Sequence, residues 1–433
     1  MTLSSVATSP SQQVRPWAIA LAGMVSLATA VGIGRFAFTP LLPLMLHEGV
    51  IDLHTASWLA SANYLGYLVG ALLCTFQPWI WQRFKGLPPM GALIWVRAGL
   101  AATSLVTLGM VLHIPALWPM LRFAAGVASA FVFIFTSGWC LAQLAKQQAS
   151  ALGGVLYAGP GVGITFSGFL ASGMVALHLT ASVGWLIFGL LACVLSALVW
   201  QSFKPQALKE AITPLASSSA LKENTALRVH RVHIPASRKQ MLLLALAYGL
   251  AGFGYIITAT FLPVIARQVM PGSAWLDMFW PLFGISIVAG SLLATRISLG
   301  GDLRYLLAGC YFVQALGVVV PVWSPTLVGF VAGSFGLGLP FAAISFFAMQ
   351  EVRRLRPLNA ASYMGLLTAV YGTGQVLGPP VAAVLLGRSQ SPGAGFTLSL
   401  EIAAAALVLG AVLYLWMVRA YPMYRSPSQL PAL

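Results

Sequence analysis

The chain has 433 residues, of which 59% are hydrophobic and only 7% are charged, and its formal net charge is +15. An ordinary soluble domain carries roughly 25% charged residues, so this composition excludes one. A charge of +15 would suggest nucleic-acid binding in a soluble protein, but here the cations flank long apolar segments, which excludes that class.

Apolar segments follow one another along the whole chain. A helix needs about 20 apolar residues to cross the roughly 30 Å of hydrocarbon in a lipid bilayer. Segments that meet this requirement lie at 17–46, 56–80, 90–112, 115–144, 149–175, 180–203, 240–268, 274–296, 303–321, 325–350, 359–386 and 396–419. The sequence therefore predicts an all-α polytopic membrane protein with twelve transmembrane helices.

The first of these segments holds an arginine far from both of its ends. Arg35 lies in VGIGRFAFTPLLPLML (31–46), among small, aromatic and apolar residues. An arginine at mid-membrane costs roughly 2.5–3.5 kcal/mol on insertion scales, and it normally faces a bundle interior or a wet cavity. We therefore interpret Arg35 as part of a substrate cavity. The alternative is a structural arginine bonded to carbonyls that Pro40 leaves free.

A polar segment divides the chain into two halves of six spans each. We expect a cytosolic tail (1–16), a six-helix bundle (17–203), a cytosolic linker (204–239), a second six-helix bundle (240–420) and a cytosolic tail (421–433). Outside the spans nearly all cations lie on one side, and only Arg267 and Arg388 lie on the other. The positive-inside rule therefore places both termini in the cytoplasm.

The two halves are also related to each other. A shift of 220 residues superposes several identical residues of spans 1 and 7, namely Gly32 with Gly252, Gly34 with Gly254, Leu42 with Leu262 and Pro43 with Pro263. Parallel six-span repeats bind their substrate midway between the halves. Under this alignment Arg35 falls on Tyr255, so we expect the charge of the binding site to come from the first half.

Three stretches resemble a known family over essentially the whole chain. These are GIGRFAFTPLLPLM (32–45), WLASANYLGYLVGALL (58–73) and GLLTAVYGTGQVLGPP (365–380). They are similar to the bacterial YbfB/YjiJ-type branch of the major facilitator superfamily. The resemblance implies two six-helix pseudo-repeat bundles in the bacterial inner membrane. One departure lies in QPWIWQRFKGLPP (77–89), between spans 2 and 3, which lacks the glycine and aspartate usual there.

Several polar residues within the spans are candidates for substrate binding beside Arg35. Arg122 begins RFAAGVASA (122–130), which resembles a superfamily signature, and it either lines the cavity or braces neighbouring helices. The other candidates offer hydrogen bonds from spans 2, 7 and 11, and they are Asn63, Tyr64, Tyr255 and Gln375.

Glycines and prolines cluster in spans 5 and 11. Small faces let helices approach closely in lipid, so these clusters are plausible contacts between two rocking halves. The alternative is static packing. The gating candidates are Gly159, Pro160, Gly161, Gly163, Gly374, Gly378 and Pro379.

Acidic residues are scarce, and none lies at the centre of a span. If a proton drives transport, the best available carboxylates are Asp277 and Glu401, each about one turn inside the outer end of its span. Protons are therefore one candidate coupling ion. We expect no catalytic residues, no cofactor and no metal site, because His, Cys and carboxylate residues are not clustered.

These features favour a secondary active transporter that moves a small organic solute, anionic in one interpretation, by alternating access. A non-transporting membrane receptor or scaffold with the same fold is the alternative. An enzyme is not expected, because no catalytic or phosphate-binding constellation is present. The expected partners are a small-molecule substrate and the lipid bilayer, with no nucleic acid, and the protein is expected to be a monomer.

Overall fold

The computed structural model describes residues 15–84, 91–112, 114–204, 237–269, 278–297, 299, 301–389 and 392–423, and all regular elements in these ranges are helical. The first half contains α1 (Pro16–Leu27), η1 (Ala28–Ile33), α2 (Phe38–His47), α3 (Leu53–Arg83), α4 (Ala92–Gly109), η2 (Pro115–Leu117), α5 (Trp118–Lys146), η3 (Ser150–Leu152), α6 (Gly153–Tyr157), α7 (Gly159–Ala176), α8 (Ala181–Trp200) and η4 (Gln201–Phe203). The second half contains α11 (Arg238–Val269), α12 (Phe279–Thr295), α13 (Leu303–Trp323), α14 (Leu327–Leu355), η6 (Pro357–Asn359), α15 (Ala360–Arg388) and α16 (Pro392–Ala420).

The predicted fold class is confirmed. Within the described ranges, 10 helical segments are long and apolar enough to cross a membrane, and α1, η1 and α2 together form the first of them. The 17-residue α12 and the 29-residue α15 complete two sets of six. The expected linker lies almost entirely outside the described residues, between the end of η4 at Phe203 and the start of α11 at Arg238.

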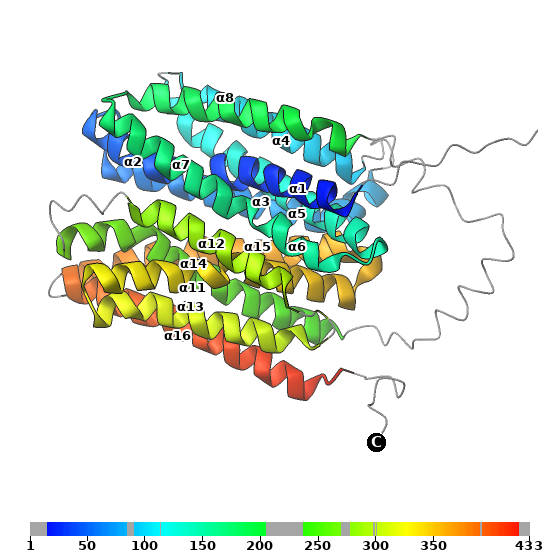
Figure 1. Ribbon diagram of the computed structural model, residues 1–433. Coiled ribbons are helices and arrows are strands. Elements are labelled where there is room, and N and C mark those ends of the chain that lie inside the picture. The colour runs from blue at the N-terminus through cyan, green and yellow to red at the C-terminus, as the bar shows by residue number, and fades with distance from the viewer. Residues whose placement is uncertain are drawn as a thin grey trace, which may run out of the picture.

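The two halves form two layers that pack along a shared seam (Figure 1). At this seam α7 and α6 lie against α12, and α3 lies against α15. The helices α3, α5, α14 and α16 each end with basic residues in their last turn, and we call this end of the bundle the basic end. The helices α1 and α11 begin at this same end (Figure 1).

Glycines allow the backbones of the two halves to approach closely. A Cβ atom on Gly161 of α7 would lie 2.7 Å from the Gly284 carbonyl oxygen of α12 and 2.8 Å from Ile287 Cβ. A Cβ atom on Gly365 of α15 would lie 3.0 Å from the Thr75 backbone nitrogen of α3. Both distances are shorter than normal carbon contacts, so only glycine fits this seam without a shift of one half against the other.

Four other glycines expected between the halves pack within one half instead. Gly159 approaches the Met24 carbonyl of α1, and Gly163 approaches the Gly32 backbone of η1. In the second half, Gly374 approaches the Gly249 carbonyl and Gly378 approaches Ile256, and both of these partners are on α11. The side chain of Pro379 lies outside the described residues. The glycine clusters of the sequence lie on α7 and α15, two helices that do meet the other half. The clusters did not show which face of each helix makes that contact.

Two hydrogen bonds cross the seam at the basic end. Arg353 Nη1 donates to the Leu141 carbonyl oxygen near the end of α5, at 2.5 Å. Gln350 Nε2 donates to the Ser150 carbonyl oxygen at the start of η3, at 3.2 Å. Both donors are on α14, and we call this pair of bonds the basic-end latch.

We predict that Gly161→Leu destabilises the seam. Overpacking a close contact costs roughly 1–3 kcal/mol, because the neighbours must move to admit the side chain. The melting temperature of the purified protein should fall, and backbone amides of α7 and α12 should exchange hydrogen faster. Gly173→Leu is the matched control on the same helix, because a Cβ atom at Gly173 meets nothing within 4 Å. Equal melting temperatures for the two variants would contradict the packing argument.

Candidate functional site

The first membrane-spanning unit is broken near its middle. Beyond α1 the chain widens into the π-helix η1, where the Gly34 N–H donates to the Thr29 carbonyl at 2.9 Å. The Phe36 N–H donates to the Val31 carbonyl at 3.2 Å, and α2 then begins at Phe38. Pro40 explains the break in part, because proline has no N–H to donate and its ring clashes with the carbonyl four residues earlier. Such π-bulges occur often at functional sites.

Arg122 of α5 satisfies the carbonyls at this break. Its Nη1 donates to the Gly34 carbonyl at 3.1 Å, and its Nη2 donates to the Arg35 carbonyl at 2.9 Å. Asn63 Nδ2 of α3 donates in turn to the Arg122 carbonyl at 2.9 Å. Arg122 also lies over the Phe38 ring, 5.0 Å from its centroid. This geometry is that of a brace, and neither Arg122 nor Asn63 lines the cavity described next.

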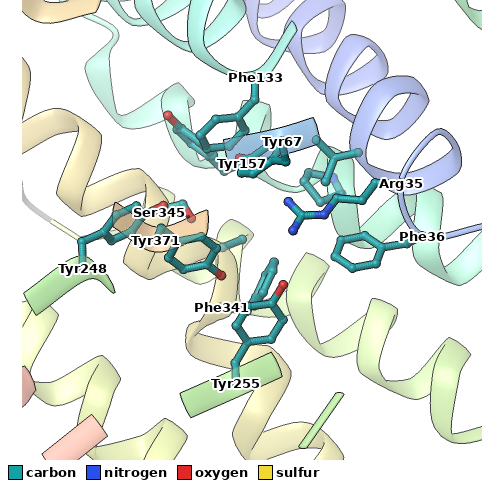
Figure 2. A pocket seen from close by; sticks show the side chains of 13 residues that line it. Arg35, Phe36, Tyr67, Phe133, Tyr157, Tyr248, Tyr255, Phe341, Ser345 and Tyr371 are labelled. Atoms are coloured by element: carbon teal, nitrogen blue, oxygen red, sulfur yellow. Dashed lines mark hydrogen bonds between the residues drawn. The ribbon is translucent and has the colours of Figure 1, made fainter. Parts of the chain in front are cut away.

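The Arg35 side chain leaves the break towards the seam and lines a cavity of about 30 Å³ (Figure 2). The volume is comparable with that of one or two water molecules. Both halves contribute walls, so the cavity lies on the seam. Its lining is mostly aromatic and consists of Val31, Arg35, Phe36, Tyr67, Phe133, Tyr157, Pro160, Tyr248, Tyr255, Phe341, Ala342, Ser345 and Tyr371.

A chain of hydrogen bonds joins the halves beside this cavity. Arg35 Nη2 donates to Gln375 Oε1 of α15, and Gln375 Nε2 donates to the Tyr255 hydroxyl of α11. Three residues singled out from the sequence therefore come together, although they lie on three separate spans. The equivalence of Arg35 and Tyr255 under the 220-residue repeat agrees with their placement on opposite sides of one seam.

Aromatic rings surround the Arg35 guanidinium. Its Cζ lies 4.1 Å from the Tyr67 ring centroid, 5.3 Å from that of Phe36 and 5.4 Å from that of Tyr64. A cation beside a ring face gains about 0.5–2 kcal/mol, and more where water is excluded. Arg35 is only 4% exposed. The rings thus offset part of the cost of removing the cation from water.

No negative charge balances Arg35 within its cavity. None of the lining residues in the described part of the chain is acidic, and Arg35 Nη2 donates to the neutral amide of Gln375. Of the two candidates for proton coupling, Asp277 lies outside the described residues. Glu401 is exposed on the outer face of α16 and does not line the cavity. The site therefore presents one uncompensated cation inside an aromatic shell.

Sequence reasoning missed much of the aromatic lining. Tyr371 precedes Gln375 by four residues, and Tyr248 precedes Tyr255 by seven, so each pair shares one face of its helix. From this spacing the sequence could have predicted that Tyr371 and Tyr248 lie on the same helix faces as Gln375 and Tyr255. Phe133 and Phe341 carry no such signal, because apolar rings within a span are ordinary packing residues.

We predict that Arg122→Gln destabilises the protein. Each buried carbonyl left without a donor costs roughly 1–3 kcal/mol, and this substitution shortens the only side chain that reaches both Gly34 and Arg35 among the described residues. Thermal unfolding in detergent should show a clear loss. The matched Arg35→Gln variant should lose less stability, because removal of a buried charge offsets the loss of the hydrogen bond to Gln375. A normal melting temperature for Arg122→Gln would contradict its role as a brace.

Comparisons with known proteins agree with this architecture. A family model described as the uncharacterised MFS-type transporter YbfB matches residues 27–415. A Bacillus subtilis (strain 168) protein described as the uncharacterized MFS-type transporter YceJ is 26% identical over 393 residues, which cover 88% of this chain and 93% of that protein. The chain therefore belongs to the YbfB family of major facilitator superfamily transporters, and it is a multi-pass membrane protein of a transport family.

Proposed function

We propose that this protein is a secondary transporter that carries a small organic anion with an apolar or aromatic body by alternating access. The observation that carries the proposal is the cation of Arg35, which lies buried on the seam with no acidic residue among the described lining. A transporter needs a site that both halves can contact, and this cavity is walled by both.

The charge of the cavity favours an anion over other solutes. Two opposite unit charges 4 Å apart attract by about 4 kcal/mol at an effective dielectric constant of about 20. Since every 1.4 kcal/mol is about tenfold in affinity, this term alone supports roughly a thousandfold preference for an anion over a neutral analogue. A cation would meet repulsion of the same size. The surrounding rings suit an apolar or aromatic remainder of the substrate.

The position of the cavity on the seam and the basic-end latch support alternating access. In parallel six-span repeats the substrate site stays near the midplane while the two halves rock around it. Here the basic-end latch holds the halves together on the basic side of the cavity. The positive-inside rule assigns the basic end to the cytoplasm, so we propose that the structure is closed towards the cytoplasm of the bacterial inner membrane.

We predict that Arg35→Gln abolishes transport while the fold is retained. Losing one member of a buried, hydrogen-bonded charge pair typically costs 2–5 kcal/mol, so affinity for an anion should fall at least about thirtyfold. Purified protein in liposomes would be screened with a panel of organic anions, cations and neutral solutes by solid-supported-membrane currents and radiolabelled uptake. We expect only anions to be carried.

Arg97→Gln provides the matched control for that screen. Arg97 is also an arginine within a span of the first half, but its Nη2 donates to the Trp200 carbonyl at 2.7 Å and it does not line the cavity. Transport should survive this substitution. Normal anion uptake by Arg35→Gln, or uptake of cations or neutral solutes alone by the unmodified protein, would overturn the proposed function. Binding without any transport would favour the receptor alternative.

A further inference from the structure

Among the described residues, nothing accepts a hydrogen bond from the buried Nε of Arg35. In any arginine, Nε and Nη2 point to the same side and form a two-pronged fork that matches the two oxygens of a carboxylate. In Arg35 the Nη2 prong donates to Gln375 Oε1. The Nε prong is buried and makes no hydrogen bond within the described part of the chain. The fork is therefore half occupied by a single amide oxygen.

The Gln375 carboxamide resembles the group that would fill the fork completely. A carboxamide is planar and has the shape of a carboxylate, but it offers one acceptor oxygen instead of two and carries no charge. Hydrogen bonds between ionised partners are roughly twice as strong as neutral ones. A free carboxylate that reaches Arg35 should therefore displace Gln375 Oε1 and also occupy Nε.

We propose that the transported anion is a carboxylate, which binds Arg35 side-on through Nε and Nη2 and takes the place of the Gln375 carboxamide. This inference rests on the proposed function. A carboxylate has two oxygens, and the fork satisfies both. A sulfonate or phosphonate has a third oxygen, which the two-pronged fork leaves without a donor.

Displacement of Gln375 also explains how substrate binding would change the contact between the two halves. The hydrogen-bond chain from Arg35 through Gln375 to Tyr255 joins the first half to the second beside the cavity. When a carboxylate binds Arg35, Gln375 loses its hydrogen bond to the first half and keeps only the one to Tyr255. Gln375 thus occupies the position of the substrate carboxylate on Arg35. Its hydrogen bond to Arg35 links the two halves, and this link is broken when substrate binds.

A variant without any added ligand tests the fork directly. Gln375→Glu places a tethered carboxylate next to Arg35, so we expect the melting temperature in lipid nanodiscs to rise by several degrees. The gain should disappear when Arg35→Lys is added, because an ammonium keeps the charge but offers no side-on fork. Gln314→Glu is the matched control. Gln314 is a buried glutamine of the same half, and its Nε2 donates to the Leu337 carbonyl at 3.1 Å. Because a glutamate there would lose this donor, the melting temperature of Gln314→Glu should fall.

A second arm measures selectivity with defined probes. Acetate, hexanoate, benzoate and indole-3-acetate would each be compared with the sulfonate and the primary amide of the same skeleton, by binding calorimetry and by uptake. We expect carboxylates to bind at least about tenfold more tightly than the matched sulfonates, and amides not to bind. Gln375→Ala should tighten carboxylate binding, Gln375→Glu should abolish it, and Arg35→Lys should lose the preference for carboxylate over sulfonate.

The two arms separate the failure of this inference from the failure of the proposed function. Equal or tighter binding of sulfonates, or a Gln375→Glu variant that loses stability as Gln314→Glu does, would overturn the carboxylate fork while anion transport stands. Transport of cations or neutral solutes with no anion carried would overturn the proposed function itself. Absence of binding for every carboxylate in the series would also count against the fork.

Discussion

The structure is organised around one buried cation that neither half can satisfy alone. Arg35 belongs to the first half, yet Gln375, which accepts a hydrogen bond from its Nη2, belongs to the second half. The nearest ring, Tyr67, is on α3 of its own half, whereas Tyr255 and Tyr371 complete the shell from the other side. A guanidinium removed from water requires acceptors and polarisable neighbours. That requirement places a polar contact between the halves at Arg35, in addition to the basic-end latch.

The break in the first membrane-spanning unit makes this placement possible, and a second arginine sustains it. Widening the helix at η1 frees carbonyls that lipid cannot satisfy, because no water is present in the bilayer core. Arg122 donates to the carbonyls of Gly34 and Arg35, so the chain can turn without leaving buried acceptors unpaired. The two arginines therefore have different tasks. One holds the backbone at the break, and the other extends from that backbone into the cavity.

The sequence predicted the twelve-span architecture and the position of Arg35, because both follow from general rules about lipid. A long apolar run must be helical in a membrane, and an arginine inside it must face protein or water. The repeat predicted that Arg35 and Tyr255 occupy equivalent positions of the two halves, and Gln375 joins them in the structure. By contrast, the sequence could not show which carbonyls Arg122 reaches, since that depends on where the π-helix widens. It also could not show that Gly161 faces the other half while Gly159 and Gly163, two residues away on either side, face their own. Successive residues of an α-helix are rotated by about 100°, so neighbouring glycines point in different directions. In an apolar helix without a clear polar face, the sequence does not show which of these directions meets the other half.

Within the described ranges, the hydrogen bonds of the basic-end latch go to backbone carbonyls rather than to carboxylates. The loop between spans 2 and 3 lacks the usual glycine and aspartate, and residues 85–90 of it lie outside the described ranges. At the basic end, Arg353 and Gln350 of α14 donate instead to backbone carbonyls of α5 and η3. A cation near a helix C-terminus gains about 0.3–1 kcal/mol from the helix dipole, and a hydrogen bond contributes about 0.5–1.5 kcal/mol net. A latch of this kind is weak enough to open for the few kcal/mol that an anion gains beside Arg35. The free energy that holds the latch and the free energy that an anion gains at Arg35 are therefore of similar size. If the halves rock as proposed, binding at the seam can then shift the equilibrium between the closed and open states of the basic end.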